Sequence, residues 1–363
     1  MDFAFSEEQQ MLREQAASFL TDKMPHERVV ELAESDEGWD PSVWREIAEL
    51  GWLGLSVSED AGGAGYGFLE EAVLFEEMGR ALFVGPYFST VGLALPALER
   101  DENALRRVVA GEEVVTLAWA EEPGLTTLSE LDAVGTKAES SNGSWSLTGD
   151  KVLVPDAGIA DRAVIIAQRP DGVGLFLTDV DSPEVASTMD PTRRLGKLTL
   201  TGAEASPLAE PAEASSVLTR IRLRALAAVS LEGVGIAQTA LDLALAHAKE
   251  RKQFDKPIGT YQAVSHQIAD TYMATELARS LAYWAAWCVA EGDDRAAVAV
   301  AAAKSHAGAA AVAACERSIQ VHGGIGFTWE HVLHRFYKRA QWIESFAGYG
   351  SAHRSAIAAS LLD

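Results

Sequence analysis

The feature of this sequence that most limits its possible folds is a change of hydrophobic period that occurs twice along the chain. Apolar residues recur at helical spacing in 1–115, alternate as in strands in 116–215, and return to helical spacing in 216–363. We therefore predict an α+β multidomain fold. An N-terminal α-helical domain (1–115) is followed by a middle antiparallel β-barrel or sandwich domain (116–215) and a C-terminal four-helix bundle (216–363).

Local signals in the first part agree with helices. Ser6 and Gln9 form a capping box before an apolar helical repeat, and Asp40 followed by Pro41 predicts another helix start. The stretch 62–67 (Gly-Gly-Ala-Gly-Tyr-Gly) matches a dinucleotide-binding fingerprint. No strand-then-helix context surrounds it, so we do not expect a Rossmann site there.

The middle part carries strand and hairpin signals. Asn-Gly at 142–143 predicts a tight turn, with alternating apolar residues after it. Further strands are expected at 114–120, 151–154, 163–167 and 173–180. This pattern predicts the barrel or sandwich.

Two helix ends in the last part of the chain predict a binding site for a pyrophosphate. In 320–327 (Gln-Val-His-Gly-Gly-Ile-Gly-Phe) three glycines end a long Ala-rich helix, and glycine lets a ligand phosphate approach the backbone. In 250–259 (Glu-Arg-Lys-Gln-Phe-Asp-Lys-Pro-Ile-Gly) a basic cluster ends an earlier helix. Each signal alone is typical of an ordinary helix end, so the prediction depends on finding both.

Together with the order helical, β, helical, these stretches resemble the acyl-CoA dehydrogenase family over nearly the whole chain. The family pattern of Arg-x-x-Phe-Gly, a Gln, and Gln-x-x-Gly-Gly-x-Gly-Phe is matched by Arg251, Phe254, Gln262, Gln320, Gly323, Gly324, Gly326 and Phe327. The resemblance implies a flavoprotein that uses FAD to oxidise an acyl-CoA thioester to the 2-enoyl-CoA. It also implies that Arg251, Phe254, Gln262, Gln320, Gly323 and Gly324 contact an FAD shared across a subunit interface.

The catalytic base of the family is missing from its usual positions. In much of the family the Glu of a Tyr-Glu-Gly-Thr loop takes the α-proton of the substrate, and the matching residue here is Ala347. Other members place the base at the start of the first bundle helix, where this chain has Ala225. Glu344, one helical turn before Ala347, is either a relocated base or a solvated helix-end residue. Glu250 beside Arg251 is expected to be a structural ion-pair partner.

The loop and strand that hold a family member's own flavin are also altered. The family loop Thr-Glu-Pro-Gly-x-Gly-Ser-Asp reads Glu-Glu-Pro-Gly-Leu-Thr-Thr at 121–127, and the family strand Trp-Ile-Thr reads Leu-Val-Pro at 153–155. Pro155 supplies neither the hydroxyl of the family threonine nor an N–H. The residues that this chain keeps are those with which a family member contacts the FAD of its neighbouring subunit. One kept element is imperfect, because Asp255 replaces the glycine after Phe254 and a carboxylate repels pyrophosphate.

This pattern of loss predicts the non-catalytic subunit of a heteromeric acyl-CoA dehydrogenase, resembling bacterial α2β2 heterotetramers that act on steroid side-chain CoA thioesters. A catalytic partner subunit would supply the base and the flavin cradle, and acyl-CoA would bind through the complex. Two alternatives stay open. One is a self-sufficient homotetrameric dehydrogenase with a relocated base, and the other is a non-enzymatic scaffold without flavin.

Composition narrows the partners and the location. The net charge of −23 argues against nucleic acid and against an anionic membrane surface, because both attract an excess of Lys and Arg. Cys288 and Cys315 are typical of core residues in a reduced cytoplasmic protein, and the first residues lack a signal-peptide pattern. His331 and His334 near Glu330 have no further ligand in the sequence, so we predict no metal site.

Overall fold

The computed structural model describes residues 5–121 and 134–362. Its internal contacts divide the chain into two compact units. The first unit holds the described residues up to Glu31, Phe68–Phe83 and those from Leu226 onward; the second holds Leu32–Gly67 and Val84–Ala225. Helix α7 (Pro211–Glu250) runs from the second unit into the first.

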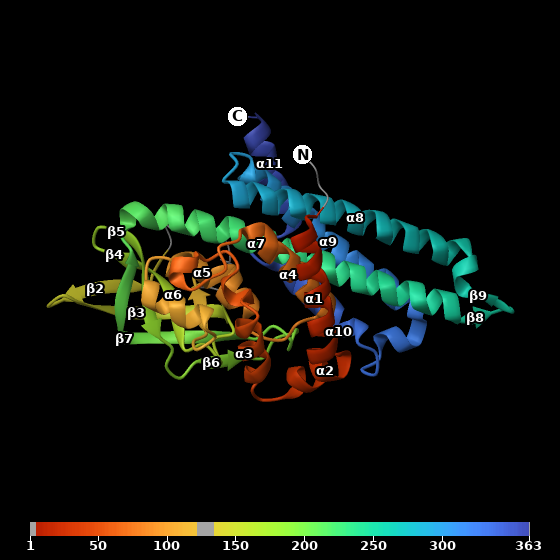
Figure 1. Ribbon diagram of the computed structural model, residues 1–363, viewed down its shortest axis with the longest axis horizontal. Helices are drawn as coiled ribbons and strands as arrows, with labels where there is room; N and C mark the ends of the chain where they lie inside the picture. Colours follow the sequence, from red (N-terminus) through yellow and green to blue (C-terminus); the bar gives the residue numbers. More distant parts are fainter. Residues whose placement is uncertain (1–4, 122–133, 363) are drawn as a thin grey trace. The chain divides into compact units, whose positions relative to one another are not determined.

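The second unit is built around the predicted β-barrel, drawn in yellow and green in Figure 1. Its strands are β1 (Val115–Ala118), β2 (Lys137–Ser141), β3 (Ser144–Pro155), β4 (Arg162–Arg169), β5 (Gly172–Asp179), β6 (Glu184–Ala186) and β7 (Leu195–Ala209). They neighbour one another in the order β1-β4-β2-β3-β7-β5, and a further β4–β5 pairing closes the ring. Inside it, Leu147, Ile165 and Phe176 are fully buried.

Strand pairing confirms the predicted hairpin and corrects one expectation. Ser141 pairs with Ser144, and Asn142 and Gly143 between them both have positive φ, as a two-residue turn of the favoured hand requires. The barrel is not wholly antiparallel, because β1 pairs with β4 in parallel and β2 touches β4 in parallel. Parallel neighbouring strands are joined by a long crossover rather than a hairpin, so no turn motif in the sequence predicts their pairing.

The helices of the second unit are short. They are α3 (Pro41–Glu49), η1 (Trp52–Gly54), η2 (Glu59–Ala61), the π-helical segment η3 (Phe88–Ala94), α5 (Leu95–Leu98) and α6 (Glu102–Val109). The predicted start of α3 is confirmed, since the Asp40 side chain accepts hydrogen bonds from the N–H groups of Ser42 and Val43. The glycine-rich stretch 62–67 follows η2 as a loop with no strand before it, so it is no Rossmann turn.

The first unit contains the C-terminal helices together with three helices from the start of the chain. Its elements are α1 (Glu7–Lys23), the first turns of α2 (His26–Glu34), α4 (Phe68–Ala81), α8 (Gln262–Glu291), α9 (Ala296–His322), η6 (Gly323–Phe327), α10 (Leu333–Ser345) and α11 (Gly350–Leu362). A hairpin of β8 (Lys252–Gln253) and β9 (Lys256–Pro257), then η5 (Ile258–Thr260), joins α7 to α8. Helix α9 packs against α8, α10 and α11 and is the centre of the predicted bundle (Figure 1).

Helices α4 and α7 cross at a pair of glycines. A Cβ added to Gly79 would collide with the backbone at Glu232, and one added to Gly235 would collide with the backbone at Glu76. The two helix backbones therefore touch without side chains between them. Such an approach is open only to glycine.

Close to this crossing, the buried carboxylate of Glu76 joins three helices. Glu76 is 1% exposed; it accepts from Arg13 Nη2 at 2.8 Å and from Tyr283 Oη at 2.7 Å, and it pairs with Arg279. Burial raises the pKa of Tyr283 to about 12, so this hydroxyl stays protonated and donates. The network ties α1, α4 and α8 together.

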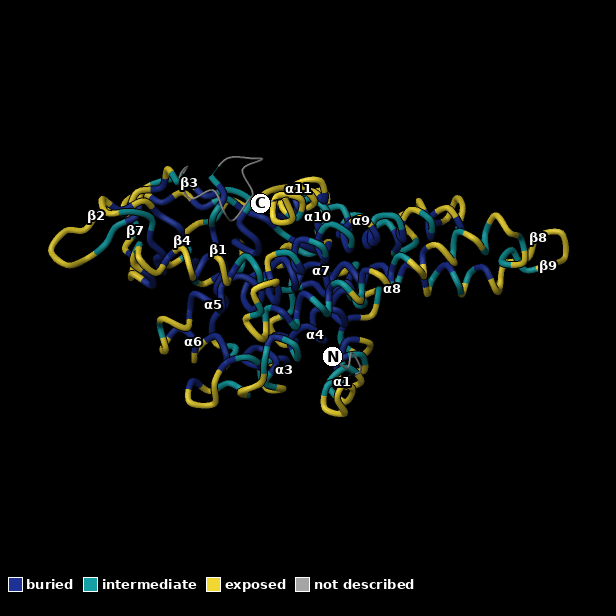
Figure 2. Tube along the Cα trace, turned by 90° about the horizontal axis from the view of Figure 1, so that it is seen from above, coloured by how far each residue is buried: buried dark blue, intermediate teal, exposed yellow. Residues whose placement is uncertain are grey.

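Two helical stretches, Pro211–Glu250 and Ala296–Phe327, are long and apolar enough to cross a membrane by length and composition alone. However, 78% and 61% of their most apolar windows are buried within the fold. Figure 2 shows this burial along α7 and the contrast with the exposed β8–β9 hairpin at its end. Both stretches are therefore buried core helices.

Candidate functional site

The basic stretch after α7 forms a tight hairpin. Strand β8 pairs with β9, and Phe254 and Asp255 occupy the turn with φ values of 51° and 62°. The Tyr261 hydroxyl donates to the Gln253 carbonyl oxygen at 3.0 Å and ties the hairpin to the start of α8. Phe254 is 87% exposed. Asp tolerates the left-handed backbone better than most residues, which explains how Asp255 fits where the family has glycine.

The glycine-rich turn ends α9 as predicted. Gly323 has a φ of 66°, and its N–H donates to the carbonyl oxygens of Gln320 and Ile319. A Cβ added to Gly326 would lie 2.8 Å from the Ile319 carbonyl oxygen, so this glycine is required by close packing. Around Gly324 an added Cβ would meet no described atom within 4 Å. Two glycines thus shape the turn, and the third leaves open backbone for a ligand.

The structure brings the two stretches to the same end of the first unit. His247, in the last turn of α7, stacks on His322, the last residue of α9, with ring centroids 4.4 Å apart. Arg251 follows His247 by one helical turn, and Gly323 follows His322 directly. An apolar cluster at this end is formed by Ala244, Ala248 and Val321, with Ile258, Val264 and Ile268 packed against it.

The polar residues predicted at this site are exposed. Arg251, Gln262 and Gln320 all reach solvent. The expected ion pair between Glu250 and Arg251 is not formed within the described residues, where Arg251 makes only backbone hydrogen bonds. A guanidinium without a carboxylate partner, near open glycine backbone, is suited to phosphate oxygens.

Neither family base position carries a proton acceptor. Ala225 is fully buried inside α7, and Ala347, just beyond α10, is 7% exposed with a φ of 52°. Lys304 of α9 holds this segment, because its buried Nζ donates to the carbonyl oxygens of Glu344 at 3.1 Å and Gly348 at 3.2 Å. Burial lowers the pKa of Lys304 to about 8, against the attraction of Glu344. The segment is thus fixed in shape without the family's acid.

The carboxylate of Glu344 is packed between helices. Its Oε1 accepts from the Gly350 N–H at 3.4 Å. Its Oε2 is buried, lies against Gly308 of α9, and has no hydrogen-bond partner in the described part of the chain. This position within helix packing favours a structural role for Glu344 over that of a relocated base.

At the start of the altered flavin loop, an internal ion pair is formed. The side chain of Lys151 on β3 is fully buried and its Nζ donates to Glu121 Oε1 at 2.6 Å. Glu121 also accepts from the N–H groups of Gly135 at 2.5 Å and Thr136 at 2.8 Å. Burial alone would raise the pKa of Glu121, but these hydrogen bonds lower it. Residues 122–127 of the loop lie outside the described residues.

The strand position where the family has threonine offers no donor. Pro155 ends β3, and its carbonyl oxygen accepts from Thr116 Oγ1 at 2.6 Å. The next residue, Asp156, is buried and accepts from Ser89 Oγ at 2.6 Å. The polar groups at this strand end therefore bond to one another.

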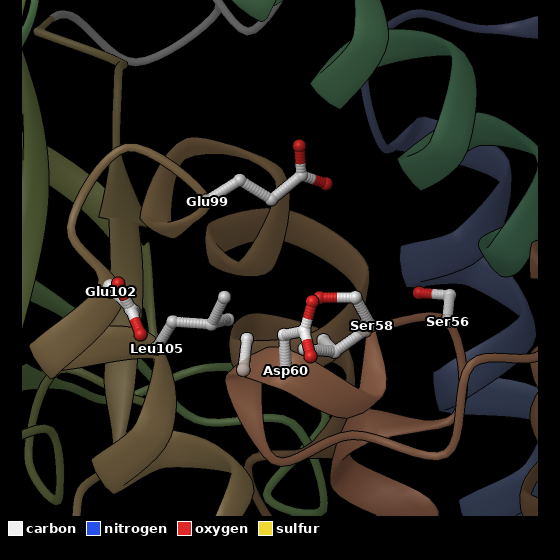
Figure 3. Close-up of a pocket in the computed structure, with 8 residues that line it drawn as sticks. Ser56, Ser58, Asp60, Glu99, Glu102 and Leu105 are labelled. Carbon is white, nitrogen blue, oxygen red and sulfur yellow. The ribbon is translucent and has the colours of Figure 1, made fainter.

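An open cavity of about 540 Å³ lies within the second unit, and Figure 3 shows the side chains around it. Asp60 comes from η2, Glu102 and Leu105 come from α6, and Glu99 precedes α6. Two of its three carboxylates are ion-paired, Glu99 with Arg220 at 2.9 Å and Glu102 with Arg106 at 2.6 Å, so the cavity offers no free cation for a phosphate among the residues that line it.

The contacts between histidine rings near this site are visible only in the structure. His322 Nδ1 lies 2.8 Å from the Ser318 carbonyl oxygen. The sequence misses its contacts with His247 and with His331, because residues far apart in the chain carry no shared period. Within residues 5–121 and 134–362, no group of His, Cys, Asp and Glu is placed to hold a metal ion.

Comparison with known proteins shows to which family the chain belongs. The acyl-CoA dehydrogenase N-terminal domain profile matches residues 6–101, and the acyl-CoA dehydrogenase C-terminal domain profile matches residues 219–362. Acyl-CoA dehydrogenase IpdE2 of Mycobacterium tuberculosis is 34% identical over 338 residues, which are 92% of this chain and 91% of that protein. The chain belongs to the acyl-CoA dehydrogenase family. This is a family of FAD-dependent oxidoreductases.

Solved acyl-CoA dehydrogenase structures share the fold over the full chain. The steroid acyl-CoA dehydrogenase Tcur3481-Tcur3483 superposes with a TM-score of 0.88 at 33% identity, covering 98% of each chain. The ChsE4-ChsE5 complex from Mycobacterium tuberculosis superposes with a TM-score of 0.87 at 27% identity, covering 100% of this chain and 99% of that one. Each of these two structures is named for a pair of different proteins.

Proposed function

We propose that this acyl-CoA dehydrogenase family member is the non-catalytic subunit of a heteromeric enzyme and completes the FAD site of a catalytic partner subunit. One contrast carries the proposal. Both positions of the family base hold buried alanines, Ala225 and Ala347, whereas Arg251 and the glycine turn 323–324 are exposed. An alanine side chain accepts no proton. An exposed arginine and open glycine backbone suit the pyrophosphate of a neighbour's cofactor.

Each retained residue has a role in this proposal. FAD, when bound, accepts the hydride removed from the acyl-CoA. Arg251 would bind the pyrophosphate by charge-assisted hydrogen bonds, and the turn 323–324 would let a phosphate reach the backbone. Gln262 and Gln320 would donate amide hydrogen bonds, and Phe254 would cover the cofactor with its exposed ring.

The altered loop and strand support the proposal that this chain does not itself provide most of an FAD site. Where the family has the threonine that opens its flavin loop, Glu121 forms an ion pair with buried Lys151. Where the family strand offers a hydroxyl, Pro155 has only a carbonyl oxygen. A carboxylate already engaged by Lys151 and a missing donor leave fewer groups here to bind a cofactor.

Similarity to steroid acyl-CoA dehydrogenases extends the proposal to the substrate. The complex would oxidise a steroid side-chain CoA thioester, with the acyl group in the catalytic partner, and would work in the cytoplasm. The net charge of −23 disfavours a nucleic-acid partner and is compatible with a protein partner.

The two other functions fit the geometry less well. A self-sufficient enzyme would need Glu344 to reach the substrate, but its carboxylate is packed against Gly308. A scaffold without flavin would have no use for an exposed Arg251 that pairs with no carboxylate in the described residues. Both remain outcomes of the following test.

The test is a visible absorption spectrum of the full chain, purified alone and with a co-expressed catalytic acyl-CoA dehydrogenase subunit. A colourless chain whose complex contains FAD supports the proposal. A yellow chain that is bleached by acyl-CoA on its own indicates the self-sufficient enzyme. Protein that is colourless in both samples indicates the scaffold.

Restoring a carboxylate at the base position is expected not to create a dehydrogenase. The Ala347→Glu variant, purified without a partner, should oxidise acyl-CoA no faster than wild type, because Glu121 and Pro155 leave the flavin pocket incomplete. The measurement is reduction of an electron-accepting dye with acyl-CoA and added FAD, with Ala347→Gln as the uncharged control. Robust oxidation by the glutamate variant alone would show that only the base had been lost.

The bundle is expected to assemble with another subunit through α8. This helix exposes Tyr272 at 57%, Met273 at 65% and Leu277 at 52%, and its Trp284 and Trp287 are half-buried. Burying such side chains stabilises an interface by about 1.5–3 kcal/mol each. Sedimentation should therefore give at least twice the chain mass of 38.8 kDa for the chain alone or with its partner.

A charge on that face should break the assembly. Leu277→Glu is expected to give a folded monomer, and Met11→Glu on exposed α1 is the matched control that should leave the assembly intact. Wild-type protein that sediments as a folded monomer in both samples would rule out assembly through this surface.

A further inference from the structure

Three imidazole rings contact one another at the end of the first unit that carries Arg251 and the glycine turn 323–324. We call Arg251 and this turn the FAD half-site. His322, at the end of α9, is the middle ring. Its centroid is 4.4 Å from that of His247 on α7 and 4.6 Å from that of His331 after η6. All three side chains are half-buried. We call His247, His322 and His331 the imidazole stack.

Hydrogen bonds determine which ring nitrogens can take up a proton. His322 Nδ1 lies 2.8 Å from the Ser318 carbonyl oxygen, which only accepts, so the neutral ring carries its proton on Nδ1. His331 Nδ1 accepts from the Leu333 N–H at 3.2 Å, so its proton is on Nε2. His247 makes no ring hydrogen bond within the described residues. His322 Nε2 and a nitrogen of His247 are therefore open to protonation.

The surroundings of His247 keep its ring neutral. Burial lowers the pKa of His247, and the neighbouring His322 and Arg251 lower it further by repulsion. Glu250 acts in the opposite direction but does not outweigh them. A positive charge on this ring would therefore need a new anion nearby.

The surroundings of His331 act in the same direction. Burial lowers its pKa first, followed by repulsion from His322, His26 of α2 and His247. Glu330 is its neighbour in the chain, is exposed, and does not offset these effects. His322 repels a proton on both flanking rings, so the stack binds protons as a coupled group.

We propose that the imidazole stack is a proton-linked part of the FAD half-site, so that a pyrophosphate bound at Arg251 and Gly323 makes the stack take up a proton from solvent. The inference rests on the proposed role of the half-site and adds its regulation by pH. The physical reason is that the negative phosphates offset the repulsion that disfavours a proton on His247 and His331. Histidine is the side chain whose charge changes in the physiological range.

The direction of the pH effect follows from linkage. Between the pKa of the free stack and the higher pKa of the liganded stack, the complex with FAD bound holds more protons than the free one. FAD affinity therefore rises as pH falls through that interval and levels off below it. The gain is lost as pH rises above the higher pKa of the liganded stack. Uptake of one proton changes the affinity by at most about tenfold per pH unit.

The test uses the assembled complex with FAD removed. FAD dissociation constants are measured at about pH 8, 7 and 6, where the diester phosphates of FAD keep their charge. Wild type should bind several-fold more tightly at the lowest pH. His322→Gln, which keeps a donor toward the Ser318 carbonyl oxygen, should show a weaker pH dependence than wild type. His306→Gln on α9, whose ring contacts the Ala274 carbonyl oxygen instead, should behave as wild type.

Calorimetry counts the protons directly. FAD binding is titrated near neutral pH in two buffers of different ionisation enthalpy. Wild type should take up a measurable fraction of a proton, and His322→Gln should take up less. If His322→Gln does not fold, as judged by a thermal melt, His247→Gln replaces it.

The outcomes separate the two proposals. Equal pH dependence in wild type and the stack variant, or no proton uptake by wild type at any pH, would overturn the role of the stack while FAD binding itself stands. A complex that binds no FAD at any pH would overturn the proposed function, and the inference with it.

Discussion

Replacing Arg251 with alanine is expected to remove most of the FAD from the assembled complex at limiting FAD. The guanidinium is exposed and pairs with no carboxylate in the described residues, so a pyrophosphate is its natural partner. A charge-assisted hydrogen bond contributes about 1.5–3 kcal/mol, which is a roughly 10- to 150-fold change in affinity. The measurement is flavin absorbance per complex, together with a thermal melt. The isolated chain should change little, because it should hold little flavin.

Two control variants make the Arg251 result specific. Lys252→Ala removes a charge one residue further along β8 and should cost much less, because only Arg251 matches the family position. Arg251→Lys keeps the charge but loses the two-pronged donor, so its FAD content should fall between wild type and alanine. Unchanged flavin in an intact Arg251→Ala complex would remove the cross-subunit role and the main support for the proposed function.

Replacing Glu76 with alanine is expected to give the largest loss of stability, about 3–5 kcal/mol in the free energy of unfolding. The carboxylate is 1% exposed and is shared by Arg13, Arg279 and the Tyr283 hydroxyl. Its removal leaves two partly buried guanidinium groups with weaker partners, Arg13 with Glu77 at 3.5 Å and Arg279 with Glu276 at 3.3 Å. Urea unfolding followed by circular dichroism gives the free energy directly.

A matched control for Glu76 lies on the same network. Glu276 also pairs with Arg279, at 3.3 Å, but its side chain is 42% exposed. Surface pairs contribute about 0–1 kcal/mol, so Glu276→Ala should be nearly neutral. Adding Arg279→Met to the Glu76→Ala variant should recover part of the loss. If Glu76→Ala costs no more than Glu276→Ala, the buried network does not stabilise this unit.

Local signals in the sequence predicted local structure well. The capping box at Ser6 is present, with its side chain accepting from the Gln9 N–H. The Asn142-Gly143 turn and the helix end at Gly323 are also where expected. In each case one or two residues have a backbone preference strong enough to decide the conformation.

What could not be predicted depends on residues far apart in the chain. Strand β1 pairs with β4 in parallel as part of the barrel, and no turn motif between the two strands predicts this pairing. The β8–β9 hairpin has Phe254 and Asp255 at left-handed positions, where a sequence signal would have required Asn or Gly. The meeting of His247 with His322 depends on how α7 and α9 pack.

For the candidate site, the family motif predicts the residues but not the contacts that surround them. Arg251 and Gly323 were matched by spacing, and the fold brings their helix ends together. The pairing of Glu250 with Arg251 was expected from adjacency, yet it is not formed in the described residues. Adjacent residues at a helix end point in different directions, so adjacency alone is weak evidence for an ion pair.

The contact between Gly79 and Gly235 also limits how the length of this chain can change. Because two helix backbones touch there, α4 and α7 can cross in only one register. Inserting one residue into either helix would turn the following part by about 100° and drive a Cβ into the opposite backbone. At Gly143 and Gly292 an added Cβ would meet no described atom within 4 Å. Insertions and deletions accepted during divergence should therefore collect at those two turns and be absent from the helical crossing.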